Sequence, residues 1–201
     1  MDHRLEQYLS WRKGIFIEAG ANDGYRQSNT YFLERFRDWS GVLVEPIPDL
    51  AMEAQRERPR SQVINTALVA PDFPETTIQI RFGGLKSAVR AGRGWDGESG
   101  FGEVWDAPYE IKVPARTLTD VIEETGIERV DFLSLDVEGY EPQALAGLDL
   151  DRYAPRFILV EIVNGAAGRQ RVEEVLGASY KMIEKISPQD YLYEFTASPD
   201  Q

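Results

Sequence analysis

The order of apolar and polar positions changes repeatedly along the chain, from runs that are apolar throughout to segments whose apolar residues are three or four positions apart. The runs are typical of strands buried on both faces of a parallel sheet, and the spaced segments are typical of helices that cover such a sheet. Strands are therefore predicted at 14–19, 42–45, 62–66, 130–137 and 156–162. Helices are predicted between and after them at 31–36, 49–58, 118–124, 140–148 and 169–176.

Two further patterns complete the predicted fold. Segments 180–186 and 191–195 predict an antiparallel hairpin at one edge of the sheet. Segments 77–82 and 109–113 alternate like half-exposed strands, and they flank a stretch that is rich in glycine and tryptophan. The predicted fold class is thus α/β, a mostly parallel sheet with helices on both faces and an inserted β/loop segment at about 70–114.

Within this insertion, residues 82–108 are a candidate lid on the substrate side. Aromatic side chains stack on rings, and glycines provide the hinges that a lid needs. Trp95 and Trp105 are the side chains expected to contact a bound acceptor. A surface loop whose tryptophans pack on the edge of the sheet fits the same residues.

Composition narrows the class of protein. A length of 201 residues is usual for one domain, so 1–201 is predicted to be a single domain. The net charge of -12 opposes binding to nucleic acid or to an anionic membrane, and neither partner is expected. The chain has no cysteine, which excludes disulfides and thiolate zinc sites. Residues 1–13 lack the apolar run of a signal peptide, so a cytoplasmic location is expected, and a monomer and a homodimer are both compatible with the sequence.

The loop after the first predicted strand has the pattern Glu18-x-Gly20-x-x-x-Gly24. Gly20 allows a tight turn and a close approach of a ligand to the backbone. Gly24 lowers the steric strain of the turn that leads into the helix. The pattern is neither the Gly-x-Gly-x-x-Gly of dinucleotide sites nor a Walker loop. Because Glu18 and Asp23 would repel a pyrophosphate, the loop favours a ligand that carries an ammonium and a sulfonium.

Glu45 ends the second predicted strand, about 25 residues after the glycine turn, where a carboxylate can accept two hydrogen bonds from a ribose diol. For Glu45 on its own, a helix cap or a solvent-facing side chain is the favoured interpretation. Together with the acidic first loop, Glu45 favours adenosine without phosphate.

Acidic residues also follow the two later buried strands. Asp136 and Glu138 lie at the end of the strand at 130–137, where Asp136 could be a plain helix cap or a functional group, and Glu141 is expected on the outer face of the next helix. Glu161 interrupts an apolar strand and is followed by Asn164. A charged group in that position needs either a buried arginine as its partner or a chemical role.

Four sequence blocks follow one another along the chain. They are residues 18–24, Gln27-Ser28-Asn29-Thr30, Val44-Glu45-Pro46 and Leu135-Asp136-Val137-Glu138-Gly139-Tyr140-Glu141. Together they resemble the FkbM-type methyltransferase family. The resemblance implies a seven-stranded Rossmann-like class I sheet, S-adenosylmethionine as methyl donor, and oxygen acceptors on sugars or secondary metabolites. Residues 82–108 match no pattern of the family, so the resemblance does not identify the acceptor. Few residues precede the first strand, and a lid is therefore expected from elsewhere in the chain.

By position, the resemblance assigns the methionine part of the donor to the loop 18–24, the ribose to Glu45, and the border of the adenine to Asn65 and Ala67. The donor-binding set predicted from it comprises Glu18, Gly20, Asn22, Asp23, Gly24, Ser28, Glu45, Asn65, Ala67 and Asp136.

Methyl transfer to a hydroxyl requires alignment of donor and acceptor, and also removal of a proton. The only histidine, His3, lies in the terminal segment, so a histidine base would require that segment to fold over the site. Carboxylates are the remaining candidates, with Asp136, Glu138 and Glu161 as the predicted catalytic residues. In one arrangement Asp136 or Glu138 takes the proton directly. In the other, Asp136, Glu161 and Asn164 bind Mg²⁺, which lowers the pKa of the hydroxyl.

Two alternatives of other classes stay open on the sequence. One is a noncatalytic module that binds S-adenosylmethionine or a protein partner, although acids at all four strand ends favour an enzyme. The other is a nicotinamide or nucleotide-sugar enzyme on a similar sheet, which the missing Gly-x-Gly-x-x-Gly disfavours. The expected partner is a hydroxylated small molecule.

Overall fold

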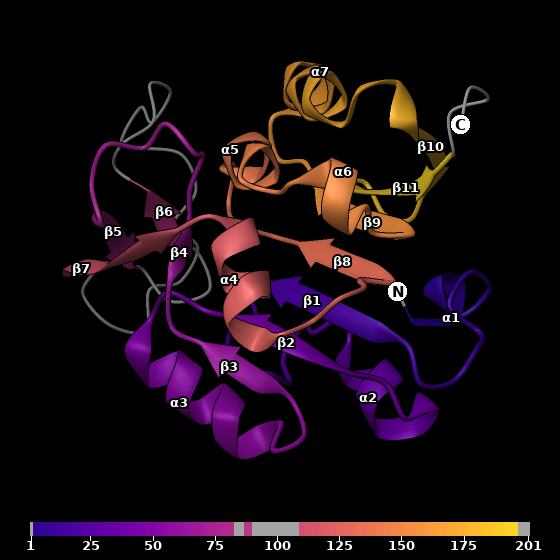
Figure 1. Ribbon diagram of the computed structural model, residues 1–201, viewed down its shortest axis with the longest axis horizontal. Helices are drawn as coiled ribbons and strands as arrows, with labels where there is room; N and C mark the ends of the chain where they lie inside the picture. The colour runs from indigo at the N-terminus through magenta and orange to yellow at the C-terminus, as the bar shows by residue number, and fades with distance from the viewer. Residues whose placement is uncertain (1, 83–86, 90–108, 197–201) are drawn as a thin grey trace.

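The computed structural model describes residues 2–82, 87–89 and 109–196, which form two sheets and the helices around them (Figure 1). The larger sheet has seven strands in the order β10-β11-β9-β8-β1-β2-β3. Their bounds are β1 Ile15–Ala19, β2 Ser40–Val44, β3 Gln62–Ile64, β8 Phe132–Leu135, β9 Phe157–Glu161, β10 Tyr180–Lys185 and β11 Asp190–Phe195. All neighbours from β9 to β3 are parallel, whereas β11 is antiparallel to both β9 and β10. The predicted fold class and the edge hairpin are confirmed.

Alternation along the central strands sends side chains to opposite faces of this sheet. Ile17 of β1 packs in one apolar cluster and Phe16 in the other. The first cluster contains residues of α4 (Leu118–Thr125), α5 (Glu141–Ala146), α6 (Leu150–Tyr153) and α7 (Gly165–Leu176). The second contains residues of α1 (Asp2–Leu5), α2 (Tyr31–Arg37) and α3 (Pro48–Glu57). Helices thus cover both faces.

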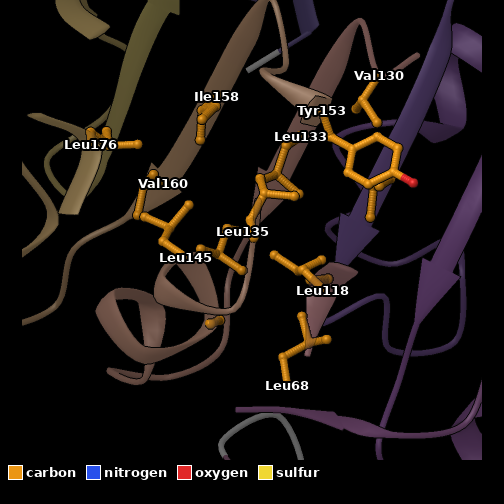
Figure 2. Close-up of a cluster of buried hydrophobic side chains, with 14 of the residues drawn as sticks. Leu68, Leu118, Val130, Leu133, Leu135, Leu145, Tyr153, Ile158, Val160 and Leu176 are labelled. Atoms are coloured by element: carbon orange, nitrogen blue, oxygen red, sulfur yellow. The ribbon is translucent and has the colours of Figure 1, made fainter. Parts of the chain in front are cut away.

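Figure 2 shows the first cluster, in which Leu133 and Leu135 of β8 lie beside Ile158 and Val160 of β9. Leu145 of α5 lies close to Leu135 and Val160 in this view. All five side chains are at most 1% exposed. Burial of such a side chain stabilises the fold by about 1.5–3 kcal/mol, so this face is a main source of stability.

Local signals set where α4, which packs on this face, begins and ends. Thr117 and Asp120 form a capping box, in which the Thr117 hydroxyl accepts from the Asp120 amide at 3.1 Å and the Asp120 carboxylate accepts from the Thr117 amide at 3.1 Å. Gly126 ends the helix with a left-handed φ of 70°. The predicted helix at 118–124 is therefore found within one residue of its predicted end.

The smaller sheet has the order β4-β7-β5-β6, with β4 Ala67–Leu68, β5 Thr77–Phe82, β6 Ser87–Val89 and β7 Tyr109–Arg116. Its core includes Ile78, Ile80 and Val113, together with Ile47, which follows β2. The sheet thus packs beyond the carboxyl ends of the parallel strands (Figure 1). The predicted strands at 77–82 and 109–113 are confirmed, whereas Trp95 and Trp105 of the predicted lid lie outside the described residues.

Several predicted elements differ from those observed, and the helix predicted at 169–176 already begins at Gly165. The strand predicted at 62–66 ends at Ile64, because the chain crosses to the second sheet, where the Thr66 hydroxyl donates to the carbonyl of Pro114 at 3.0 Å. The strand at 130–137 stops at Leu135, before a turn that contains left-handed residues at 138 and 139. The helix predicted at 140–148 spans only Glu141–Ala146, and a separate short helix that was not predicted, α6, follows it with Asp149 as its N-cap. No helix in the described ranges combines the length and apolar character needed to cross a membrane.

Candidate active site

A cavity of about 390 Å³ lies where the loops after β1, β2, β8 and β9 meet the second sheet. This volume is within the range of about 300–1,000 Å³ that is usual for small-molecule sites. Seven residues of the predicted donor and catalytic sets line it: Gly20, Asn22, Glu45, Ala67, Asp136, Glu138 and Glu161. The position agrees with the rule that open parallel sheets bind ligands beyond the carboxyl ends of their strands.

Gly20 brings two of these loops into contact. Its φ is 82°, and its amide donates to the carbonyl of Val44 at 3.0 Å. A Cβ at this position would lie 1.8 Å from the carbonyl oxygen of Asp136, closer than any real contact. Only glycine therefore allows the loop after β1 to pass the backbone at the end of β8.

Glu45 is a buried carboxylate at the cavity wall, with 5% of its surface exposed. Its two oxygens accept from the backbone amides of Asn22 at 2.8 Å and Ile47 at 2.9 Å. Each carboxylate oxygen can accept a second hydrogen bond, so the pair can still receive two hydroxyls of a ribose. Burial raises the pKa of Glu45 to about 7, against the opposing effect of the two amides.

Asp136 and Glu161 form a hydrogen-bonded pair of carboxyl groups in the same cavity. Burial first, then the hydrogen bond and charge of Glu161, and then the charges of Glu138 and Glu141 raise the pKa of Asp136 to about 9. At neutral pH Asp136 therefore keeps its proton, because two carboxylates in contact do not both ionise readily. The partner that the structure gives Glu161 is this carboxyl group and not the buried arginine considered from the sequence.

Glu138 lines the cavity, but Glu141 does not lie on the outer face of its helix, so that prediction is wrong. Glu141 is only 3% exposed and accepts from the amides of Val137 at 3.2 Å and Gly139 at 2.8 Å. Its carboxylate holds the turn between β8 and α5, and burial raises its pKa. The spacing of two and four residues back to those amides is the signal that could have indicated this role.

Glu18 is buried away from the lining of the cavity. It accepts from the amide of Asn29 and the hydroxyl of Thr30, both at 2.6 Å, and from the hydroxyl of Ser28 at 2.8 Å. In register, Glu18 pairs with Leu43 of β2, whose side chain packs on the face of α2 and α3. Glu18 thus organises the segment 28–30, and burial raises its pKa.

Five other predicted site residues shape the loops without being among the lining residues: Asp23, Gly24, Ser28, Asn65 and Asn164. Asp23 accepts from the amides of Tyr25 and Arg26, and Gly24 packs against Ala54 and Arg58. Asn65 donates to the carbonyls of Glu45 at 2.8 Å and Pro46 at 2.9 Å.

Asn164 precedes α7 as its N-cap residue and makes no side-chain cap bond. Within the described part of the chain, no group of three or more histidine, cysteine, aspartate and glutamate side chains is arranged to hold a metal ion.

Several lining residues were not among the site residues predicted from the sequence, although Gln27 and Tyr140 lie within its motif blocks. Arg26 and Gln27 come from the loop after β1, Tyr140 from the start of α5, and Gln189 from the β10–β11 turn. Gln27 has a left-handed φ of 58°, and Asn22 and Glu138 share this conformation, with φ of 51° and 54°. Strained backbone of this kind concentrates at functional sites, which supports the cavity as the active site.

Comparison with known proteins agrees with this geometry. The family model of the methyltransferase FkbM domain matches residues 18–194. A TehB-like SAM-dependent methyltransferase from Corynebacterium glutamicum ATCC 13032 Kitasato is similar in structure, with a TM-score of 0.52 at 10% identity over 97% of this chain and 87% of that one. An O-methyltransferase from Bacillus cereus in complex with SAH gives a TM-score of 0.51 at 13% identity, over 96% and 77%. No curated protein matches the sequence. At these identities the two structures are evidence of a common fold.

Proposed function

The chain belongs to the FkbM family of S-adenosylmethionine-dependent methyltransferases, and on this premise we propose that it methylates a hydroxyl group of a small molecule, a sugar or a secondary metabolite. The observation that carries the proposal is the carboxyl pair of Asp136 and Glu161 in the same cavity as Gly20 and Glu45. A binding module without chemistry has no need of such a pair beside its ligand.

The residues of the cavity fit an adenosine that carries a positive charge. Glu45 is placed to accept from a ribose, and Leu50, Ala67 and Leu68 offer apolar surface to a base. The acidic wall of the cavity, in which Glu138 and Glu161 lie beside the protonated Asp136, favours a sulfonium nearby and disfavours a phosphate. The same acids oppose a dinucleotide, so they also argue against a nicotinamide enzyme.

When bound, the donor supplies a methyl group that is open to in-line displacement. The protein has to align the acceptor hydroxyl, exclude water and accept one proton. Within the carboxyl pair, Asp136 retains its proton, and the carboxyl group of its partner Glu161 is the proposed acceptor of the hydroxyl proton. Glu138 is a second carboxylate on the same wall that can take this role.

Direct proton removal by Glu161 or Glu138 is the arrangement that we propose, because both carboxyl groups line the cavity, whereas Asn164, one of the three predicted metal ligands, is not among the lining residues. The alternative arrangement, in which Asp136, Glu161 and Asn164 bind Mg²⁺, predicts that a chelator abolishes activity. Activity after exhaustive EDTA treatment is expected to be fully retained, whereas loss of activity that Mg²⁺ restores would establish the metal.

A screen of hydroxylated sugars and polyketides with a radiolabelled methyl donor tests the reaction itself. Labelled product with a methyl ether is the expected result. Calorimetric titration with S-adenosylhomocysteine separates the alternatives. Binding of this product analogue without any methylated acceptor would favour a noncatalytic module, and tight binding of NAD would favour a redox enzyme.

A further inference from the structure

Arg58 is the most deeply buried charged side chain near the active site, with 1% of its surface exposed, yet it is not among the residues that line the cavity. It follows the last turn of α3 and lies on the face of the sheet that carries α2 and α3. A buried guanidinium is costly unless its donors are all used, so its partners indicate what it holds in place.

Three nitrogens of Arg58 are engaged on two sides. On the scaffold side, Nε donates to the carboxylate of Glu34 in α2 at 2.7 Å. On the loop side, Nη1 donates to the carbonyl of Gly24 at 3.1 Å and to the hydroxyl of Ser28 at 3.2 Å. Nη2 donates to the hydroxyl of Thr30 at 3.0 Å.

Two aromatic rings and a second carboxylate fix the guanidinium further. Its central carbon lies 5.3 Å from the ring centre of Phe16 and 5.5 Å from that of Tyr31. Nη1 is also 3.7 Å from the carboxylate of Glu18, which binds the same loop through Ser28 and Thr30. A planar fork with several fixed donors suits this site, and a lysine cannot reproduce it.

The loop that Arg58 holds forms part of the cavity wall. Its anchors at Gly24 and Ser28 enclose three residues, of which Arg26 and Gln27 line the cavity. Gln27 has a left-handed φ of 58°, a conformation that costs energy and needs support from its surroundings. One side chain therefore clamps both ends of a strained segment beside the donor site.

We propose that Arg58 is a positioning residue for the methyl donor, which acts by holding residues 24–30 against the cavity. The inference rests on the proposed function in one respect, that the donor occupies this cavity. Without the clamp, the segment can move, and donor binding then has to restore its order at the expense of affinity.

Arg58→Met and Arg58→Lys are the direct test, with Thr30→Val as a milder variant that removes loop-side hydrogen bonds and keeps the guanidinium. The matched control is Asp131→Asn. Asp131 is also buried and accepts from a β1 amide, that of Ile15 at 2.8 Å, but it lies at the amino end of the sheet, away from the cavity. Its loss is therefore expected to lower stability without changing the donor site.

Titration calorimetry with S-adenosylhomocysteine is the first measurement. The dissociation constant is expected to rise about tenfold or more in the Arg58 variants, because small displacements of positioning groups are costly, and by a smaller factor in Thr30→Val. Asp131→Asn is expected to change it by less than about twofold at a similar loss of melting temperature. Folded Arg58 variants with wild-type affinity would overturn the proposal. If neither Arg58 variant folds, the dissociation constant of Thr30→Val is the test, and wild-type affinity in this variant would overturn the proposal.

Hydrogen–deuterium exchange without any ligand is the second measurement. Amides at 22–31 are expected to exchange faster in the Arg58 variants and in Thr30→Val than in the wild type, and no faster in Asp131→Asn. Unchanged exchange there would refute the clamp even if the affinity falls. Failure of the wild type to bind S-adenosylhomocysteine, with faster exchange in the Arg58 variants, would instead refute the donor site and leave the clamp standing.

Discussion

At the scale of single residues, the cavity holds carboxyl groups that burial keeps protonated well above their ordinary range. The pKa of Glu45 is raised to about 7 and that of Asp136 to about 9. Free glutamate and aspartate titrate near pH 4.3 and 3.9. The site is therefore less negative at neutral pH than its composition suggests, and a bound cation would favour loss of these protons.

The proton on Asp136 links stability to pH. Since the pKa is about 9 in the folded protein and about 3.9 in the unfolded chain, the folded state binds the extra proton between these values. The stabilisation is complete below about pH 4 and is lost as the pH rises through 9. Asp136→Asn does not titrate, so its melting temperature relative to wild type is expected to rise steadily from pH 5 to pH 9.

Thermal unfolding of both proteins in EDTA-containing buffers at pH 5, 7 and 9 measures this difference. A difference that is constant or shrinks as the pH rises would contradict the shared proton.

Glu45→Gln tests the ribose contact. An amide has one acceptor oxygen in place of two, and the amides of Asn22 and Ile47 already need both. We expect the affinity for S-adenosylhomocysteine to fall by about tenfold or more at pH 8, since hydrogen bonds to a charged group contribute about 1.5–3 kcal/mol. Glu53→Gln, an exposed change of the same charge on α3, is the control and is expected to bind normally.

For the wild type, the same titration is expected to weaken as the pH falls from 8 to 6, through the pKa of about 7 of Glu45. Affinity that is independent of pH in this range would mean that the carboxylate form does not hold the ribose.

Residue types in the sequence identified the acids of the site, but not which way each one points. Glu45, Asp136 and Glu161 were predicted as functional, and all three line the cavity. Glu18 and Glu141 instead bind the amides and hydroxyls of their own loops. Their direction depends on strand register and on the turn after each strand, and neither can be derived from spacing alone.

At the scale of elements, Gly20 sets how closely the ends of β1 and β8 approach. Gly20→Ala would place a methyl group 1.8 Å from the carbonyl oxygen of Asp136, against rigid backbone. We expect this variant to lose S-adenosylhomocysteine binding and to unfold at much lower urea concentration than wild type.

Gly126→Ala is the matched control, because Gly126 has a similar φ of 70° but no atom within 4 Å of the added Cβ. It isolates the cost of the left-handed backbone, about 1–2 kcal/mol, from the cost of the clash. Equal destabilisation of the two variants would show that the contact with Asp136 is not limiting.

Most element types were predictable because the apolar period differs clearly between buried strands and amphipathic helices. The errors lie where a loop residue changes the direction of the chain. Thr66 leads the chain into the second sheet, and Asp149 caps a separate helix, α6. Both depend on side-chain hydrogen bonds, from Thr66 to Pro114 of the second sheet and from the first α6 amides to Asp149, and a hydrophobic pattern does not encode either.

At the scale of the whole molecule, the two sheets meet at the cavity, so a ligand there contacts both. A ligand that binds only the folded state at about 100 times its dissociation constant stabilises by about 2.7 kcal/mol. For a domain of this size, we expect S-adenosylhomocysteine to raise the melting temperature by roughly 5–10 °C. NAD at the same concentration is the control, and an equal shift with NAD would contradict the donor assignment.

The parallel sheet and its edge hairpin could be predicted as a whole, because each strand carries its own signal. The association of β4 with β5, β6 and β7 into a second sheet could not, since β4 is only two residues long. Its pairing with β7 joins Ala67 to Ala115, positions far apart in the sequence. Of the lining residues that this sheet supplies, Ala67 was predicted to border the adenine, whereas Leu68 and Ile80 were missing from the sequence-based site.

The contact between Gly20 and the backbone of Asp136 has a consequence for redesign of the enzyme. Because the two loops touch through main-chain atoms, substitutions in one cannot be compensated by side-chain changes in the other. Ile80, in contrast, reaches the cavity from the separate second sheet. Mutant libraries aimed at new acceptors should therefore diversify β5 around Ile80 and keep both loops constant, so that acceptor selectivity changes while the methyl-transfer site is retained.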